Sequence, residues 1–553
     1  MTETTALTGD FLYQLQHVGD AAHRLIAMQD RDPLSPSFGS FHYPYWRDKT
    51  SEFADARFQE AGAALGLLAH PHFRGIGKER GWPQPVELLA AFGAGLVNLR
   101  RLQYPEGSYD EWYKGERGFA ATAFTTFAFA AAAIELGDLL PADVQALLRE
   151  TLARAARWLE GREDLVKVNH EVVAAAALAA YGRLCADDVA LSGARDNLER
   201  SLATQQPEGW FPELRGMDFG YSALVVDYLG HYGRLVGMEQ VVAPATRLIG
   251  FLAPHLHPDL TLSAEGGTCR NPYAGQAGYV LFAPHIEGAA AIARHLATLS
   301  APASQARAMA YLADDLRLAR WSVLPLLGAL AFQQSSGIGT ADKLPFPQGW
   351  TVNPGAGVAA FHADRLHVYV PYAGGAVVRI YAGDTLVLAD RGVECHLEGA
   401  DLTSLTYDAD RTATTAPGSI VTRFNLARAG YFYPGFLLRL ILRLGSVTGW
   451  SSRRLREAID WYRKRKRTAI NQSATSVGRS GGDHVLERRV EIEDGRVIVS
   501  DFIASAGLRI RPRLDGPNLA ADANAEIAAT GAVASRKVVD IASGRIEVEV
   551  EQV

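Results

Sequence analysis

The stretch that decides the fold is FAATAFTTFAFAAAAIEL, residues 119–136. Its aromatic and aliphatic side chains recur at three- and four-residue spacing, which predicts an α-helix. Alanine fills most of the other positions, so the helix is apolar on more than one side. Residues 174–180, AAAALAA, have the same composition. Both stretches therefore predict helices that pack closely against neighbours on several sides.

The same spacing continues outward from this stretch, over residues 50–320. Successive segments are similar in length, which predicts helix hairpins arranged in series as a solenoid or a closed toroid. The predicted helical segments are Phe53–Leu68, Pro85–Leu102, Phe119–Leu136, Pro141–Leu159, Val168–Leu184, Ala194–Thr204, Tyr221–Leu235, Gln240–Leu256, Gln276–Leu299 and Ala303–Leu318.

After about residue 345 the apolar period changes from that of a helix to that of a strand. Gly and Asp turns separate short segments in which apolar and polar residues alternate or apolar residues follow one another. Examples are Leu366–Pro371, Val377–Tyr381 and Arg496–Ile503. Short strands of this kind predict an antiparallel β-sandwich. We therefore expect an α+β multidomain protein, with an N-terminal (α/α) toroid as catalytic domain over 1–340. A β-sandwich domain follows over 345–553, with a basic helical insertion at about 429–470.

Composition sets the class of protein. The chain has 553 residues, of which 48% are hydrophobic and 21% charged, as is usual for a globular enzyme. A net charge of −6 argues against a general nucleic-acid partner. Three scattered cysteines are too few for a disulfide framework or a cysteine-based zinc site. The N-terminus has no recognisable signal peptide, and no apolar run is long enough to span a membrane, so we expect a cytoplasmic protein.

The basic insertion is the exception to this charge balance. Residues 421–467 hold twelve Lys or Arg against two acids, a surplus of ten positive charges that leaves −16 for the rest of the chain. Before the basic run lies the apolar stretch 431–444, YFYPGFLLRLILRL. Three interpretations stay open: a hairpin packed on the β-domain, a basic face that holds an anionic glycan, and an interfacial anchor on anionic lipid. We favour the third, which predicts peripheral association with the inner membrane through 431–467.

Four polar and aromatic clusters interrupt the helical region, each where a loop leads into a helix. In a ring of helix hairpins such junctions line one end, and loops on a rigid scaffold are where binding groups concentrate. Aromatic rings stack on sugars, while Asn, His, Arg and carboxylates bind hydroxyls and charges, so the clusters predict a carbohydrate site. The clusters are 107–117 (GSYDEWYKGER), 167–171 (KVNHE), 208–221 (EGWFPELRGMDFGY) and 264–273 (AEGGTCRNPY).

Each cluster also has a structural interpretation. Asn169 and Asp218 stand where a helix N-cap is expected. The other side chains could pack in the core or orient a loop. The residues that could have a structural role of this kind are Asn169, His170, Trp210, Glu213, Asp218, Tyr221 and Glu265.

Taken in order, the motifs resemble the heparinase II/III-like polysaccharide lyases, a group that includes alginate and glycosaminoglycan lyases. The resemblance implies an incomplete α/α toroid followed by an antiparallel β-sandwich. It also implies that Asn169 and His170 neutralise a uronate carboxylate and that Tyr221 serves in proton transfer. The motifs are Ser108–Tyr113, Asn169–Glu171, Gly209–Glu213 with Asp218 and Tyr221, and Glu265 with Arg270 and Asn271.

The β-region departs from the family pattern. Family members carry a further His or Tyr there, near a His-Asn-Thr sequence, and some hold a structural zinc. This sequence has no His-Asn-Thr. His396, in Glu394-Cys-His-Leu-Glu398, and Tyr407 are the candidates for the missing partner. Nothing in the sequence supports the zinc, so we expect neither a cofactor nor a metal ligand.

These observations predict a lyase that cleaves an acidic, uronate-containing glycan by β-elimination, in a context such as exopolysaccharide metabolism. Removal of the C5 proton beside a carboxylate needs donors that stabilise the resulting carbanion, and both a base and an acid. A uronyl C5-epimerase, a glycoside hydrolase and a weakened glycan-binding component of an exopolysaccharide assembly machine are the alternatives. The expected catalytic residues, which should converge on one side of the helical domain, are Asn169, His170, Tyr221 and Arg270. The expected substrate-binding residues are Tyr109, Trp112, Trp210, Glu213, Asp218, Glu265, Asn271 and His396.

Overall fold

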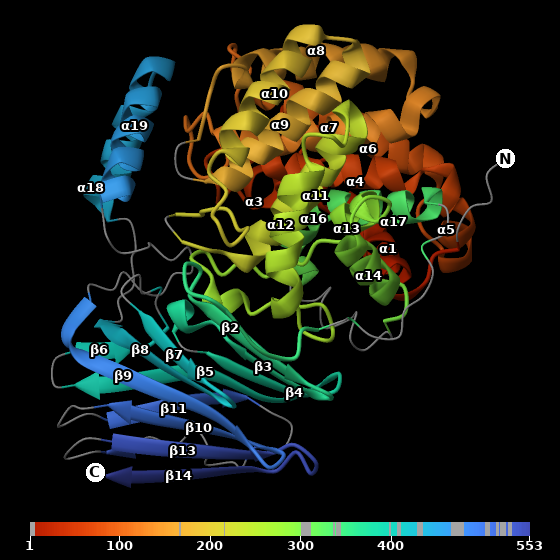
Figure 1. Ribbon diagram of the computed structural model, residues 1–553. Helices are drawn as coiled ribbons and strands as arrows, with labels where there is room; N and C mark the ends of the chain where they lie inside the picture. Colours follow the sequence, from red (N-terminus) through yellow and green to blue (C-terminus); the bar gives the residue numbers. More distant parts are fainter. Residues whose placement is uncertain are drawn as a thin grey trace.

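The computed structural model has a helical part followed by a large antiparallel sheet, as the change of period predicted (Figure 1). The last helix before the sheet is α17 (Val323–Gln334), and the first strand is β1 (Gly349–Asn353). The structure describes residues 6–164, 167–214, 216–299, 311–335, 338, 344, 346–375, 377–397, 400–405, 407, 411–428, 435–465, 480–503, 509–515, 519, 527–528 and 533–552.

Six helices form a closed ring inside the helical part. Each contacts the next in the order α4, α7, α9, α11, α13 and α17, and α17 contacts α4 again. Most of their residues are buried, because alanine and other apolar side chains cover several sides of these helices. The ring helices are α4 (Glu60–Leu68), α7 (Phe119–Leu136), α9 (Val168–Cys185), α11 (Phe219–Val236), α13 (Ala277–Phe282) and α17.

Amphipathic helices cover the ring from outside. In α8, for example, Leu148, Leu152 and Leu159 are buried, while Arg149 and Glu150 face solvent. Most outer helices follow a ring helix in the chain and pack back against it, so the ring helices run in one direction. The outer helices are α1 (Gly9–Asp20), α6 (Pro85–Leu102), α8 (Ala142–Leu159), α10 (Asp188–Leu202), α12 (Val242–Leu252) and α14 (Glu287–Leu296). Short helices in the connections are α2 (Ala22–Met28), α3 (Tyr43–Trp46), α5 (Arg74–Arg80) and α16 (Asp315–Trp321).

One helix of the described residues, Phe119–Leu139, is long and apolar enough to cross a membrane, which corrects the expectation of no such segment. Within the window that meets this test, 83% of the residues are buried inside the protein. The helix contains α7, and its apolar character serves contacts with α4, α8 and α9.

The described strands form one continuous antiparallel sheet of 14 strands rather than the two separate sheets of the predicted sandwich. Its main path runs β1-β2-β3-β4-β5-β6-β8-β9-β10-β13-β14, while β11 pairs with β5 and β12, and β7 with β8. One core contains Val368 and Ile380 from one half together with Val490, Val499 and Val539 from the other. The sheet must therefore curve until its two halves face each other. The remaining strands are β2 (Val358–Ala363), β3 (Leu366–Val370), β4 (Val378–Ala382), β5 (Thr385–Leu397), β6 (Ala400–Thr403), β7 (Thr412–Ala416), β8 (Ser419–Arg428), β9 (Ser480–Glu493), β10 (Arg496–Ile503), β11 (Arg509–Asp515), β12 (Ile527–Ala528), β13 (Val533–Asp540) and β14 (Ile546–Gln552).

Four buried charges hold the strands of this sheet together. Lys537 Nζ lies 2.6 Å from both Asp390 Oδ2 and Asp501 Oδ2, and Arg488 contacts the same two carboxylates at 3.0 and 2.5 Å. Two positive and two negative charges balance, as buried ions require. The quartet joins β5, β9, β10 and β13.

Two helices, α18 (Phe436–Gly445) and α19 (Gly449–Arg465), lie between β8 and β9. They contact each other and stand beside the helical part, above one end of the sheet (Figure 1). Residues 431–434 and 466–467 of the sequence-defined basic segment lie outside the described residues.

Candidate active site

The loops that precede the ring helices meet at one end of the ring. Lys167, just before α9, forms an isolated antiparallel bridge with Glu213, before α11. The main-chain N–H of Cys269, before α13, donates to Asp218 Oδ2 at 2.8 Å. Further round the ring, Arg320 of α16 donates to Asp55 and Glu111, which precede α4 and α7. Polar contacts thus join the N-terminal ends of α9, α11 and α13 to one another, and those of α17, α4 and α7 to one another.

In one group of these side chains each charged group has an ion-pair partner, and we call it the closed network: Asp55, Arg57, Glu60, Glu111 and Arg320. Arg57 Nε lies 2.7 Å from Glu60 Oε1, and Arg320 Nη1 lies 3.2 Å from Glu111 Oε1. Arg57 also lies 3.7 Å from Glu111 and stacks on Phe124 at 3.9 Å from the ring centre. Burial raises the pKa of Asp55 to about 6 and of Glu60 to about 7, against the pull of the arginines. The network fixes the starts of α4, α7 and α17 relative to one another.

A second group, which we call the open cluster, consists of Lys167, Asn169, His170, Glu213 and Tyr221. The main-chain N–H of Asn169 donates to Glu213 Oε1 at 2.8 Å. Among the described residues, neither polar atom of the Asn169 side chain has a hydrogen-bond partner, and neither does Glu213 Oε2. The Lys167 ammonium is 5.5 Å from the centre of the Tyr221 ring. No ion pair joins this buried lysine to a carboxylate in the described part of the chain.

Burial controls the protonation of the open cluster. It raises the pKa of Glu213 to about 8, although Asn169, through its side chain and its main-chain N–H, and the charge of Lys167 oppose this change. Glu213 is therefore mostly protonated at neutral pH and does not cancel the charge of Lys167. Burial also raises the pKa of the Tyr221 hydroxyl, as do the nearby groups Cys269 and Asp218. Tyr221 thus keeps its proton and is a donor.

His170 lies in the first turn of α9, with its Nδ1 2.6 Å from Asp164 Oδ2. Burial lowers the pKa of His170, while Asp164 acts in the opposite direction. The imidazole is therefore neutral at pH 7. The short contact assigns the ring proton to Nδ1, which leaves the Nε2 lone pair available as a base. Phe124 makes an edge contact with this ring, at 6.1 Å between centroids, and so links the open cluster to the closed network.

The remaining expected catalytic residue, Arg270, faces the sheet. It has a left-handed backbone conformation (φ 53°) and donates to the carbonyl of Leu405, after β6. Glu265 likewise pairs with Arg379 of β4, and this ion pair lowers its pKa even though burial acts to raise it. Asn271 Oδ1 accepts from the nearby main-chain N–H of Tyr273 at 3.1 Å. Arg270 and Glu265 therefore lie at the boundary between the helices and the sheet.

Three residues expected to bind substrate make structural contacts. Asp218 is fully buried and caps α11, accepting from the N–H groups of Tyr221 and Cys269 at 3.0 and 2.8 Å. Tyr109 is fully buried in the core, and burial raises its pKa. Trp210 is buried too, and its indole N–H donates to Glu208 at 3.0 Å. Substrate contact by these three residues stays a prediction, and so does that by Trp112, which is 63% exposed.

The sheet contributes Tyr407 rather than His396 to this end of the ring. His396 bonds to Asp401 at 2.7 Å across β5 and β6, and no contact joins it to the open cluster within the described residues. Its expected substrate contact stays a prediction. The Tyr407 hydroxyl instead accepts from the main-chain N–H of Met217 at 3.3 Å, next to Asp218. It therefore reaches the helical loop that leads into Tyr221.

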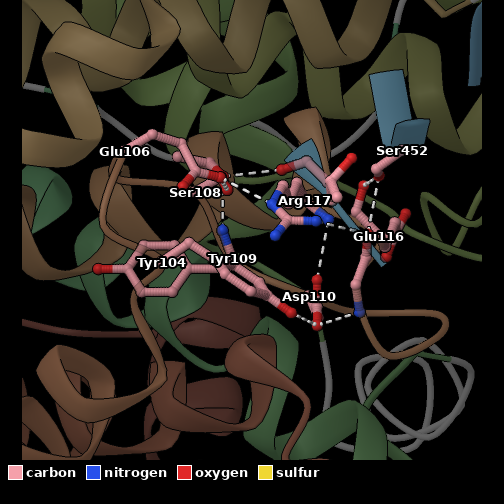
Figure 2. Close-up of polar contacts among 12 residues, drawn as sticks. Tyr104, Glu106, Ser108, Tyr109, Asp110, Glu116, Arg117 and Ser452 are labelled. Atoms are coloured by element: carbon pink, nitrogen blue, oxygen red, sulfur yellow. Dashed lines mark hydrogen bonds and ion pairs between the residues drawn. The ribbon is translucent and has the colours of Figure 1, made fainter. Parts of the chain in front are cut away.

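The loop that carries Glu111 and Trp112 is held by its own acidic side chains (Figure 2). Asp110 accepts from the Tyr104 hydroxyl and the N–H groups of Gly115 and Arg117, at 2.7, 2.7 and 2.8 Å. Glu116 accepts from the N–H groups of Glu111 and Trp112 at 2.9 and 2.7 Å. These bonds fix where the exposed tryptophan stands.

Sequence reasoning assigned no role to Lys167 or Asp164. Lys167 stands in the KVNHE motif, and the signal for it was a lysine directly before a helix of buried alanines. Asp164 lies six residues before His170 in a loop, and no sequence period links such positions. Among the described residues, no group of three His, Cys, Asp or Glu side chains is arranged to hold a metal ion.

The chain matches no known protein family and no curated protein by sequence. Several solved structures are similar at low identity. The chondroitin AC lyase of Streptomyces coelicolor A3, in complex with chondroitin sulphate, is 13% identical, with a TM-score of 0.48 over 97% of this chain and 76% of that one. A chondroitinase AC lyase is 10% identical (TM-score 0.34; 98% and 97% covered), and a sugar epimerase from a ruminal bacterium is 9% identical (TM-score 0.33; 52% and 85% covered). Family membership does not follow from values this low, so the heparinase II/III-like resemblance stays a prediction.

Proposed function

We propose that this protein is a polysaccharide lyase that cleaves an acidic, uronate-containing glycan by β-elimination. Two features of the described residues carry the proposal: Lys167, a buried residue, has no ion-pair partner among them, and the side-chain amide of buried Asn169, two positions on, has no hydrogen-bond partner among them. Burying such groups without partners costs stability, and a carboxylate would complete both of them. The N-terminal ends of the ring helices add a favourable potential for an anion there.

Lys167 and Asn169 would bind the uronate carboxylate in this mechanism. When the C5 proton leaves, negative charge spreads from C5 onto that carboxylate, and preorganised donors stabilise it. The sequence pattern implied that His170 shares this task. A neutral imidazole whose Nδ1–H is already donated to Asp164 has no second N–H for a carboxylate, so we assign the task to Lys167 instead. Arg270 is engaged by the Leu405 carbonyl and has a positioning role.

His170 and Tyr221 would carry the proton transfers. Nε2 of His170 accepts the C5 proton, and the electrons of the C5–H bond form the C4–C5 double bond. The C4–O4 bond breaks as Tyr221 donates its proton to O4, which leaves with the departing chain. Exchange with water then returns a proton to Tyr221 and removes one from His170. This division follows from the pKa directions, since the tyrosine holds its proton and the histidine is unprotonated.

A glycoside hydrolase would need two carboxyl groups free to face one glycosidic bond. Glu213 binds the Asn169 N–H, Asp218 caps α11, and Glu265 pairs with Arg379. Asp218 and Glu265 are therefore committed elsewhere, and of the three acids Glu213 alone belongs to the open cluster, which favours elimination over hydrolysis.

The test is a panel of uronate polymers incubated with the purified full-length protein. A lyase produces ultraviolet absorbance from the new double bond and unsaturated ends by mass spectrometry, and Tyr221→Phe should abolish both. New reducing ends without a double bond would overturn the proposal in favour of hydrolysis. Deuterium at C5 without cleavage would indicate an epimerase, and binding without turnover a glycan-binding component.

A further inference from the structure

Helix α18 presents an apolar face to solvent. Its five residues are spaced so that they share one side of the helix, and their exposed fractions lie between 38% and 82%. The residues of this face, which we call the α18 face, are Phe436, Leu437, Leu440, Ile441 and Leu444. Soluble proteins rarely leave so compact an apolar group uncovered, so a contiguous patch of this kind marks an interaction site.

The polar side of the hairpin is the side that holds it to the protein. Arg443 pairs with Glu52 of the helical part at 2.7 Å. The Ser452 hydroxyl of α19 donates to the carbonyls of Gly115 and Glu116 at 2.7 and 3.1 Å (Figure 2). An ordinary surface helix buries its apolar side and exposes its charges. In α18 no residue is buried, so its apolar side is exposed together with its arginines, and the contacts at Arg443 and Ser452 attach the hairpin to the helical part.

Charge identifies what covers the α18 face. Residues 436–467 contain ten Lys or Arg and two acids, within a chain whose net charge is −6. A second copy of the chain would bring the same positive charge and repel the first. A polyanionic glycan would match the charge but has no use for five aliphatic and aromatic side chains. A surface of anionic lipid matches both features, because its headgroups attract the basic residues and its acyl region accepts the apolar face.

We infer that the α18–α19 hairpin binds the surface of an anionic membrane. Ten residues of helix span about 15 Å, half of a ~30 Å hydrocarbon core, so α18 lies in the plane of the interface rather than across it. Ser452 attaches the hairpin to the loop that carries Glu111 and Trp112. Membrane binding would therefore bring the lipid surface beside the open end of the ring.

The test measures co-sedimentation of the full-length protein with phosphatidylcholine vesicles, with and without phosphatidylglycerol. We expect binding to the anionic vesicles, no binding to the neutral ones, and weaker binding at high salt. The double variant Leu437→Glu/Ile441→Glu should bind at least about tenfold more weakly, since it puts two charges into the acyl boundary. Leu34→Glu is the matched control, because Leu34 is 92% exposed and far from the hairpin in sequence, and it should bind like the unchanged protein.

A second variant separates charge from apolar contact. Arg453→Ser/Arg454→Ser removes two exposed cations and should weaken binding severalfold at low salt. Circular dichroism of every variant checks that loss of binding is not loss of fold. Equal binding to neutral vesicles, no binding at all, or full binding by Leu437→Glu/Ile441→Glu would overturn the inference. Self-association of the unchanged protein that this double variant abolishes would overturn it in favour of a second copy.

Discussion

The closed network and the open cluster occupy the same end of the same ring of helices, but they differ in how their charges are matched. In the closed network every carboxylate and guanidinium of Asp55, Arg57, Glu60, Glu111 and Arg320 has a partner of opposite charge within 4 Å. In the open cluster Lys167 has no ion pair, and the Asn169 amide and Glu213 Oε2 have no hydrogen-bond partner, in the described part of the chain. Most members of both groups are buried, so exposure does not separate them.

This difference in charge pairing indicates which group stabilises the fold and which group takes part in the reaction. A buried charge that has its partner fixes the elements around it, and breaking the pair is costly. A buried polar group without a partner lowers stability and is retained where a ligand completes it. We therefore assign the fold of the ring end to the closed network and the reaction to the open cluster.

Tyr221→Phe gives the largest effect expected on the open side of this comparison. Loss of the hydroxyl removes the proton donor, and we expect turnover to fall by about 10²–10⁴-fold with the fold intact. The matched control is Tyr228→Phe, two turns further along α11 and packed against Phe124 and Phe127. Steady-state rates should separate the two variants. Equal rates for Tyr221→Phe and Tyr228→Phe would remove Tyr221 from the mechanism.

Arg320→Met gives the largest effect expected on the closed side. The change leaves Asp55 and Glu111 buried without their shared partner. We expect the free energy of unfolding to fall by about 3–5 kcal/mol, as measured by urea denaturation. A fall of less than 1 kcal/mol would mean that the network does not fix the ring end.

Lys167→Met is the counterpart of Arg320→Met on the open side. The lysine has no ion pair to lose within the described residues, so stability should stay the same or rise slightly. Turnover should fall by about 10²–10³-fold, because one donor to the developing negative charge is gone. Lys167→Arg, which keeps the charge, should retain part of the activity. A large loss of stability with unchanged turnover would reverse the comparison.

Glu213→Gln has an effect that depends on pH. The folded protein raises the pKa of Glu213 from 4.5 to about 8, so folding favours the protonated form. The stabilisation that protonated Glu213 gives the folded protein is complete at pH values below 4.5, the pKa of this group in the unfolded chain. It is lost as the pH rises through about 8, the pKa of Glu213 in the folded protein. Glutamine cannot ionise, so the variant should gain roughly 2 kcal/mol relative to the unchanged protein between pH 6 and pH 8. Urea denaturation of both proteins at pH 6 and pH 8 measures this gain. If the difference in the free energy of unfolding between the variant and the unchanged protein is the same at both pH values, Glu213 is not protonated as we infer.

Local pattern predicted the order of helices and strands, but it missed α1 and α17, merged α13 and α14 into one helix, and did not give the partners of the buried groups. Alanine on several sides of 119–136 predicted a buried helix, and α7 is one. Period-two segments after residue 345 predicted strands. The same patterns suggested Tyr109 and Trp210 as cleft residues, because an aromatic side chain in a loop has the same sequence signature whether it stacks on a sugar or fills the core.

The sequence by itself determined that helices precede strands, that polar clusters stand before the helices, and that a basic segment interrupts the sheet. The tertiary structure decided that Arg320 meets Asp55, 265 residues away, while Lys167 meets no carboxylate among the described residues. It also decided that Tyr407 rather than His396 reaches the ring, and that α18 turns its apolar face outward. The physical reason is range: helix and strand periods depend on neighbours a few residues apart, whereas the pairing of a buried charge depends on which distant segments the fold brings within 4 Å.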